Sequence, residues 1–103
     1  MHGLLITFTS SAGLEELEQP FADYAEALRS VPGLACKTWL HDGDLFGGFH
    51  VFANREDADA YLAGELVAGL TANPAFSDFE IRHYQVLDEL SARTGTPQPA
   101  LSR

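Results

Sequence analysis

The residues best suited to chemistry lie in one stretch, Pro32 to Phe52, which reads P-G-L-A-C-K-T-W-L-H-D-G-D-L-F-G-G-F-H-V-F. It holds the only Trp and the only Cys of the chain, together with two of its four His. Trp39 supplies an indole, Lys37 a cation, and His50 an imidazole that titrates near neutral pH. Such a mixed set is a candidate ligand site, provided that the fold places the three side chains on one face.

A tight turn decides which side chains share a face. Asp42-Gly43-Asp44-Leu45 suits a two-residue hairpin turn with Gly at its first central position. The cross-strand pairs that this turn predicts on one face are His41 with Phe46, Trp39 with Gly48, and Lys37 with His50. Phe52 follows on the same face. The other face is apolar and carries Cys36, Thr38, Leu40, Gly47, Phe49 and Val51. A slip of one residue would exchange the two faces.

Each candidate also has a purely structural interpretation. Gly48 opposite Trp39 either leaves a cavity beside the indole or lets the ring lie flat in a filled core. Lys37 can lay its stem along the sheet and keep its ammonium in water. His50 can be a satisfied histidine of the core or of an interface. The sequence leaves both interpretations open for all three side chains.

The other polar aromatic residues are weaker candidates. His41 lies beside the turn and is expected to be exposed, whereas His83 faces either the cavity or a partner subunit. Tyr24 and Tyr61 belong to helical stripes, and both can lean onto the sheet. The four histidines show no metal-ligand spacing, and the turn explains its two aspartates, so no metal site is expected.

Hydrophobic periodicity predicts the elements that come before the hairpin. Gly3 to Thr9 is short, apolar and β-branched, which predicts a central strand. A helical stripe follows, formed by Leu14, Leu17, Phe21, Tyr24, Ala25 and Leu28. Pro20 interrupts this stripe, so the helix either begins at Pro20 or kinks there. Pro32-Gly33 ends it in both cases.

A second helix, a strand and a tail are expected after the hairpin. Asn54 is a good N-cap for the helix, which ends near Asn73-Pro74. Its apolar stripe consists of Ala58, Tyr61, Leu62, Leu66, Gly69 and Leu70. Asp78 to Leu87 alternates and predicts a fourth strand. From Ser91 the chain is polar and Pro-rich, which favours an extended or disordered arm. We therefore expect one domain over residues 1–90 and a tail over 91–103.

The order strand, helix, strand, strand, helix, strand is that of the α+β ferredoxin-like fold. In this βαββαβ fold a four-stranded antiparallel sheet carries both helices on one face. The opposite face cannot be polar throughout, because the first strand is apolar on both sides and Phe49 and Val51 oppose Phe46 and Phe52 in direction. The sequence leaves open which face of the hairpin meets the helices, but either choice leaves apolar side chains that a small protein rarely keeps in water. Pairing of two sheets face to face is the simplest way to cover them, so a homodimer is expected.

Composition argues against several function classes. Fifteen acidic and six basic residues give a net charge of -9, unlike proteins that bind nucleic acids or anionic membranes. A single Cys cannot form an intramolecular disulfide. The N-terminal residues lack a signal-peptide pattern, and no apolar run approaches the ~18 residues of a membrane span. We expect a soluble cytoplasmic protein. No dinucleotide fingerprint, P-loop or nucleophile elbow is present.

Four segments taken together resemble the YdhR-like family of mono-oxygenases. They are P-G-L at 32–34, K-T-W at 37–39, G-G-F-H-V-F at 47–52 and A-D-A-Y-L at 58–62. The resemblance implies a dimeric α/β barrel of ferredoxin-like fold. Two residues depart from the family pattern: Pro20 within the first helical stripe, and His50 where the pattern has a tyrosine. A histidine at that position changes the available proton chemistry.

The resemblance also implies an activity. The wider group of dimeric α/β-barrel mono-oxygenases oxidises phenolic or quinol-like polyketides without flavin, haem or metal. By analogy, this chain would oxidise a small aromatic or enolisable compound without a cofactor. His50 would be the base or proton relay, and Lys37 would stabilise developing oxyanion charge. Trp39 and Phe52 would hold an aromatic substrate, and Tyr61 would hydrogen-bond its hydroxyl.

Two other classes of function stay open at this point. One is a non-catalytic dimeric protein that binds a small hydrophobic ligand, which predicts binding without turnover. The other is a related barrel chemistry, such as isomerisation, dehydration or haem degradation. A haem Soret shift on titration would favour the last of these.

Overall fold

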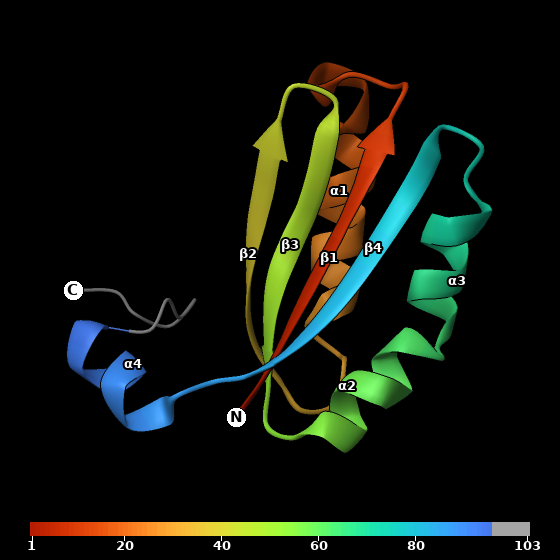
Figure 1. Cartoon of the computed structure of the whole chain (residues 1–103). Coiled ribbons are helices and arrows are strands. Elements are labelled where there is room, and N and C mark those ends of the chain that lie inside the picture. Colours follow the sequence, from red (N-terminus) through yellow and green to blue (C-terminus); the bar gives the residue numbers. More distant parts are fainter. Residues whose placement is uncertain (96–103) are drawn as a thin grey trace.

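The computed structural model describes residues 1–95, which form a four-stranded antiparallel sheet flanked by helices (Figure 1). In chain order the elements are β1 (His2–Ser10), α1 (Leu14–Leu28), β2 (Leu34–Asp42), β3 (Leu45–Phe52), α2 (Arg55–Leu62), α3 (Glu65–Ala72), β4 (Phe76–Gln85) and α4 (Asp88–Thr94). The strands lie in the order β2-β3-β1-β4. This is the predicted α+β ferredoxin-like arrangement.

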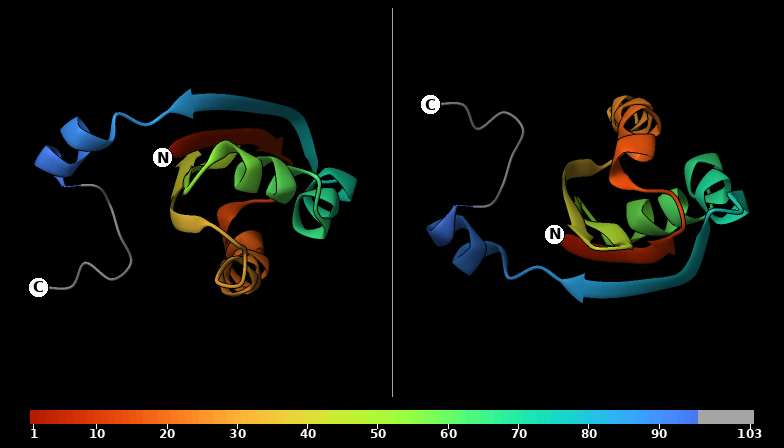
Figure 2. Two further views of the ribbon diagram at one scale, coloured as in Figure 1. Left: turned by 90° about the horizontal axis from the view of Figure 1, so that it is seen from below. Right: turned by 90° about the horizontal axis from the view of Figure 1, so that it is seen from above.

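β1 is the central strand that its apolar sequence predicts, because it pairs antiparallel with both β3 and β4. Leu4, Ile6 and Phe8 alternate along β1, and all three are buried on the face that the helices cover. Figure 2 shows α1 and the α2–α3 pair on the same side of the strongly curved sheet. The core therefore lies between β1 and these helices. Among the described residues, only α4 lies beside the other sheet face, where Ser91 and Thr94 border a groove with Phe49 and Tyr84.

The hairpin has the predicted register. Asp42 pairs with Leu45 across the two-residue turn, and Gly43 takes a φ of +60°, which favours glycine. The pairs Lys37 with His50 and Trp39 with Gly48 follow from this turn. A bulge at Ala35, which the sequence analysis did not anticipate, lies between the pairs that Leu34 and Cys36 form.

The first helix, α1, starts before Pro20, which is one of the two predicted alternatives. α1 begins at Leu14, where Glu16 Oε1 accepts a hydrogen bond from the Gly13 N–H at 3.1 Å, and Pro20 lies inside it. A helix that starts at Pro20 is therefore wrong. The first-turn acidic residues favour the earlier start, because they lie near the positive end of the helix dipole.

The predicted second helix is two helices. Asn54 caps α2 as predicted, its Oδ1 accepting from the Asp57 N–H at 2.8 Å. Helix α2 ends with Ala63 as its C-cap, and Gly64, in an extended conformation, is the N-cap of α3. Gly64 explains the break, because glycine is a poor interior helix residue and its N–H bonds the Tyr61 carbonyl at 3.0 Å.

The chain after β4 departs from the prediction. Asp88–Thr94 forms α4, so an extended arm from Ser91 is wrong for residues 91–94, and the predicted domain boundary after residue 90 falls inside this helix. The rest of the predicted tail, 96–103, lies outside the described residues. The Met1 amine lies 2.7 Å from Asp88 Oδ2 at the start of α4. α4 stands apart from the other helices (Figure 2).

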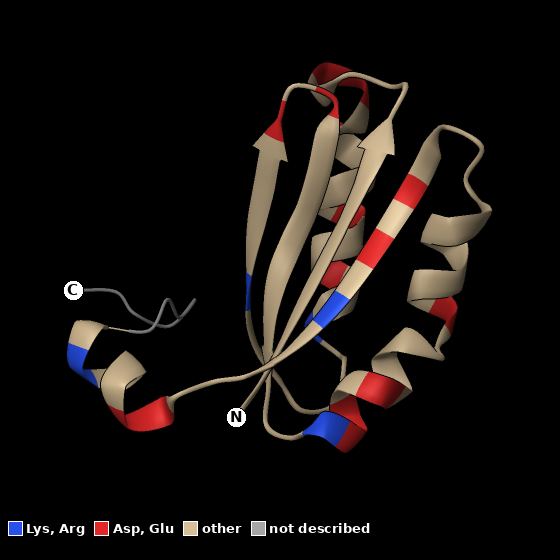
Figure 3. Ribbon diagram, viewed as in Figure 1, with Lys and Arg blue, Asp and Glu red and all other residues tan. Residues whose placement is uncertain are grey.

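Charged side chains avoid the core. Figure 3 shows acidic residues on α1, α2 and α3 and two acidic bands followed by a basic one along β4. No helix among the described residues is long and apolar enough to cross a membrane.

We predict that Gly47→Ala destabilises the fold by about 3 kcal/mol or more in urea unfolding, because a Cβ there would collide with the Ile6 carbonyl and lie 2.9 Å from Thr7 Cα. Gly69→Ala in α3 is the matched control. Nothing lies within 4 Å of a Cβ at Gly69, so this change should stabilise the helix by about 1 kcal/mol. Equal effects of the two substitutions would contradict the proposed close approach of β1 and β3.

Candidate functional site

A small cavity lies between the helix-facing side of the hairpin and the helices. It is lined by Ile6, Phe8, Phe21, Tyr24, Lys37, Trp39, Gly47, Gly48, His50, Tyr61 and Leu70. Its free volume of about 20 Å³ is room for about one water molecule. Four of the five predicted site residues border it, namely Lys37, Trp39, His50 and Tyr61. The predicted hairpin face and the cavity therefore coincide.

Lys37 fills the space that Gly48 leaves open. A Cβ at Gly48 would overlap Lys37 Cε, so the lysine stem can lie over this position only because the residue is glycine. Lys37 Nζ lies 3.6 Å from the centroid of the Trp39 ring and 5.1 Å from that of Tyr24. Both distances suit cation–π contacts. The ammonium thus points into aromatic surroundings, and the expectation of a cavity beside Trp39 is met only in part.

Burial changes the acidity of Lys37. Desolvation disfavours the charged form and lowers the pKa of the amine to about 8. No carboxylate among residues 1–95 forms an ion pair with it, so no negative charge opposes this effect. At pH 7 about a tenth of Lys37 is therefore a free amine, and the rest is the ammonium.

His50 is buried and held in one tautomer. Its Nδ1 lies 3.0 Å from the Leu4 carbonyl oxygen. Because a carbonyl only accepts, Nδ1 must carry the hydrogen, and Nε2 is left with a free lone pair. Within residues 1–95, no hydrogen-bond partner reaches the buried Nε2 atom. Such an orphan calls for an explanation, and a ligand that donates a hydrogen bond would supply one.

The acidity of His50 is also shifted. Burial, followed by the nearby charge of Lys37, lowers its pKa to about 4, although the Leu4 carbonyl opposes the change. His50 is therefore neutral at physiological pH. It is a hydrogen-bond acceptor there and a weak base.

Two tyrosines close the helical side of the cavity. Tyr24 comes from α1 and Tyr61 from α2, and their hydroxyl oxygens lie 2.6 Å apart. Burial is the main cause that raises the pKa of each, so both are neutral phenols. The pair can donate one further hydrogen bond toward the cavity, because one hydroxyl hydrogen is used between them.

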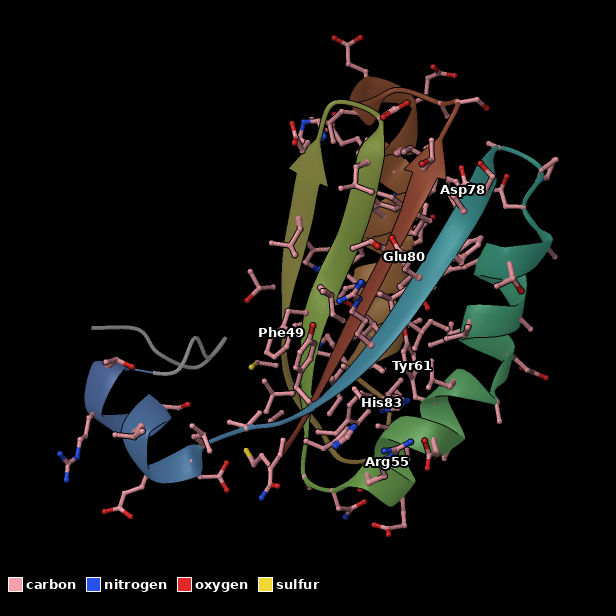
Figure 4. The ribbon with its side chains drawn as sticks, in the orientation of Figure 1. Phe49, Arg55, Tyr61, Asp78, Glu80 and His83 are labelled. Atoms are coloured by element: carbon pink, nitrogen blue, oxygen red, sulfur yellow. The ribbon has the colours of Figure 1, made fainter. Side chains whose placement is uncertain are left out.

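Some predicted residues lie elsewhere. Phe52 is fully buried behind the site, packed against Tyr61, and does not line the cavity. His41 is exposed beside the turn, as predicted. His83 does not line the cavity. Its Nδ1 instead lies 2.7 Å from His2 Nε2. Figure 4 shows His83 near α2 rather than at the hairpin.

Sequence reasoning gave too little weight to α1. Phe21 was not singled out, yet its ring centroid lies 5.2 Å from that of Trp39. Tyr24 was named only as a weak candidate, and it meets Trp39 edge-on at 6.3 Å. Their three-residue spacing on the helical stripe was the available signal, because it puts both on the face toward the hairpin.

The arrangement combines a neutral base, a hydrogen-bond acceptor and neutral phenols in aromatic surroundings. Within residues 1–95, no group of three or more His, Cys, Asp or Glu side chains could hold a metal ion. Cys36 lies on the other sheet face, and burial raises the pKa of its thiol, so it is not an activated nucleophile. The chemistry that these residues offer is proton transfer within an aromatic-walled site.

Solved structures share this fold. A protein of unknown function from Nitrosomonas europaea, NE2512, is 28% identical with a TM-score of 0.64, covering 84% of this chain and 88% of its own. SnoaB, a cofactor-independent oxygenase from Streptomyces nogalater, is 21% identical with a TM-score of 0.67, covering 82% and 91%. The heme-degrader MhuD from Mycobacterium tuberculosis is 20% identical with a TM-score of 0.65, covering 84% and 96%.

No curated protein matches the chain. The model of the family described as "Putative mono-oxygenase ydhR" matches residues 4–97, which include the hairpin, the cavity and the four strands except the first two residues of β1. The resemblance that the hairpin segments suggested is confirmed by this match. This chain belongs to the YdhR mono-oxygenase family.

Proposed function

We propose that this protein is a cofactor-independent mono-oxygenase that oxidises a small aromatic or enolisable compound at the hairpin site. The observation that supports this best is the cavity that Lys37, Trp39 and His50 line together, in which a lysine amine and an unpartnered imidazole nitrogen share one aromatic-walled space. Oxidation without a cofactor needs an electron-rich substrate anion, a base to form it, and exclusion of water. This site offers the last two.

The pKa values assign the roles differently from the family analogy. A base with a pKa of about 4 removes a proton from a phenol or activated methylene poorly, whereas an amine with a pKa of about 8 is well matched. Lys37 is therefore the proposed base, and the ammonium that it becomes stabilises the anion beside it. His50 Nε2 accepts a hydrogen bond from a substrate hydroxyl, Trp39 stacks on the ring, and Tyr61 donates through the tyrosine pair.

The proposed reaction balances with oxygen alone. An activated methylene loses one proton to Lys37, and the carbanion reacts with O₂ at carbon. One oxygen atom stays on that carbon as a carbonyl, and the other leaves as water with the two hydrogens of the methylene. The cavity of about 20 Å³ is too small for an aromatic ring. Lys37 and Trp39 must move toward the groove of about 290 Å³ that they also line, beside α1.

We predict oxygen uptake by the purified protein with anthrone- or quinol-like substrates in buffer free of metal and flavin. Lys37→Met should lower kcat/KM at least about 100-fold, because it keeps the apolar stem and removes the base. His41→Ala, exposed beside the turn, is the control and should keep full activity. A Trp39 fluorescence change without oxygen uptake would indicate a binding protein, and a haem Soret shift would indicate haem chemistry; either result would contradict the proposal.

The pH profile separates the two roles considered for Lys37. If its free amine is the base, kcat/KM rises with pH below about 8 and levels off above it, because the amine loses its proton there. If the ammonium acts only as a stabilising charge, kcat/KM falls through the same range. We predict the rising profile, measured by initial oxygen uptake from pH 6 to about 9.5. In Lys37→Arg, which stays charged throughout, the residual activity should lack this step.

We also propose that two copies pair through the sheet face opposite α1, here called the open face. Leu40 and Tyr84 lie on it and are each 44% exposed. Phe49 projects from β3 onto the same face (Figure 4). Glu80 and Arg82 of β4 form an exposed pair 3.7 Å apart, a contact that contributes little within one chain. Two-fold pairing would let these opposite charges meet across the interface.

For the wild-type protein we predict the mass of a dimer by light scattering at micromolar concentration, and the mass of a monomer for Leu40→Glu. The charge would be desolvated in the interface, whereas the side chain is already half exposed in one chain. Leu14→Glu on α1, at a position 52% exposed away from the open face, should leave the dimer intact. A monomeric wild-type protein would contradict the pairing.

A further inference from the structure

The chain contains one lysine, and the fold places it, partly buried, in the candidate site. The other five basic residues are arginines. A surface lysine is a common source of solubility, so a sole lysine placed under a tryptophan is unusual. Gly48 makes room for its stem, and Trp39 and Tyr24 surround its amine. The single lysine side chain of the protein therefore lies between aromatic rings of the candidate site.

We propose that Lys37 is a carbonyl-binding residue whose free amine forms an imine with a small aromatic aldehyde or ketone. This activity goes beyond the proposed oxygenation, because it needs neither O₂ nor an activated methylene. Neutral amines in apolar pockets are the nucleophiles that form Schiff bases with carbonyl compounds. The geometry supplies such an amine, an approach to it, and groups that handle the protons.

The approach is the groove beside α1. Lys37 and Trp39 line both the inner cavity and this groove of about 290 Å³, so the two side chains form the wall between them. Trp39 is 38% exposed, which leaves part of the indole open for an aromatic ring to stack on. A carbonyl carbon carried by such a ring can reach Nζ from the groove after a rotation of the lysine stem.

Among residues 1–95 no carboxylate pairs with Lys37, so only its cation–π contacts favour the charged form of the amine. The titratable side chains that face it are His50 from β3, Tyr24 from α1 and Tyr61 from α2. The imidazole and both phenols are neutral at physiological pH. At the mouth of the groove Arg29 adds a positive charge, paired with Glu26 at 3.2 Å. These surroundings agree with the lowered pKa of Lys37.

The step balances without a further reactant. Nζ attacks the carbonyl carbon, a C–N bond forms, and one amine hydrogen passes to the oxygen to give a carbinolamine. The hydroxyl then leaves as water, with the second amine hydrogen, while the C=N bond forms. His50 Nε2 can accept a hydrogen bond from the carbinolamine, and the tyrosine pair can donate one to the departing oxygen.

Reductive trapping tests this inference on the whole chain. The protein is treated with 4-hydroxybenzaldehyde and cyanoborohydride at pH 7 under argon, and the modified amines are located by peptide mass mapping. Arg55→Lys provides the matched reference, since the lysine that it introduces on α2 replaces a side chain that is 57% exposed. At pH 7 about 10% of an amine with a pKa of 8 is neutral, against about 0.04% for an ordinary lysine. Lys37 should therefore be modified at least about tenfold faster than the introduced lysine.

Two results would overturn the inference. One is modification of Lys37 that is no faster than that of the introduced lysine. The other is a preference for Lys37 that persists in denaturing urea, because it would then come from the local sequence and not from the folded site. The α-amine of Met1 is mapped separately, because it is a second kind of amine that can react with the aldehyde. Work under argon keeps the test independent of the oxygenation, so failure of one proposal does not imply failure of the other.

Discussion

The feature on which the site depends is a partly buried cation with no counter-ion among residues 1–95. Burying an unpaired charge is unfavourable, and the usual outcomes are an ion pair, a route to solvent or loss of the charge. Lys37 has cation–π contacts with Trp39 and Tyr24 in place of a carboxylate. The remaining cost of desolvating the ammonium appears as a pKa lowered to about 8, so part of the amine is neutral at physiological pH. The lysine is thereby turned from a surface charge into a titratable group at neutral pH.

The fold makes this arrangement through its glycines and one turn. Gly43 fixes the register of the hairpin, and the register places Gly48 opposite Trp39. Gly47 lets β3 approach the backbone of β1, which brings His50 within reach of the Leu4 carbonyl. The same hairpin therefore sets the position of the amine, the orientation of the indole and the tautomer of the imidazole.

The pairing in the hairpin could be predicted because turn chemistry and two-residue alternation determine it. The side chains that fill the space on the helix-facing side of the hairpin could not be predicted. Gly48 predicted space beside Trp39, but the space is taken by Lys37, since a long flexible side chain two residues away can reach it. Phe52 has the predicted direction, yet α2 covers it, and the depth of burial depends on packing that alternation does not report. The bulge at Ala35 left no signal in residue types.

The histidine at position 50 has a consequence for selectivity in the proposed reaction. Because the Leu4 carbonyl takes the Nδ1 hydrogen, Nε2 can only accept, so it favours a ligand that presents a hydroxyl. A tyrosine here could both donate and accept. When the enolic form of the substrate becomes a ketone in the product, the hydroxyl donor is lost and Nε2 is again left unpaired, which costs about 1–3 kcal/mol for a buried acceptor. His50 would therefore bind a phenolic or enolic substrate more tightly than its quinone-like product, and product release would be favoured without any movement of the fold.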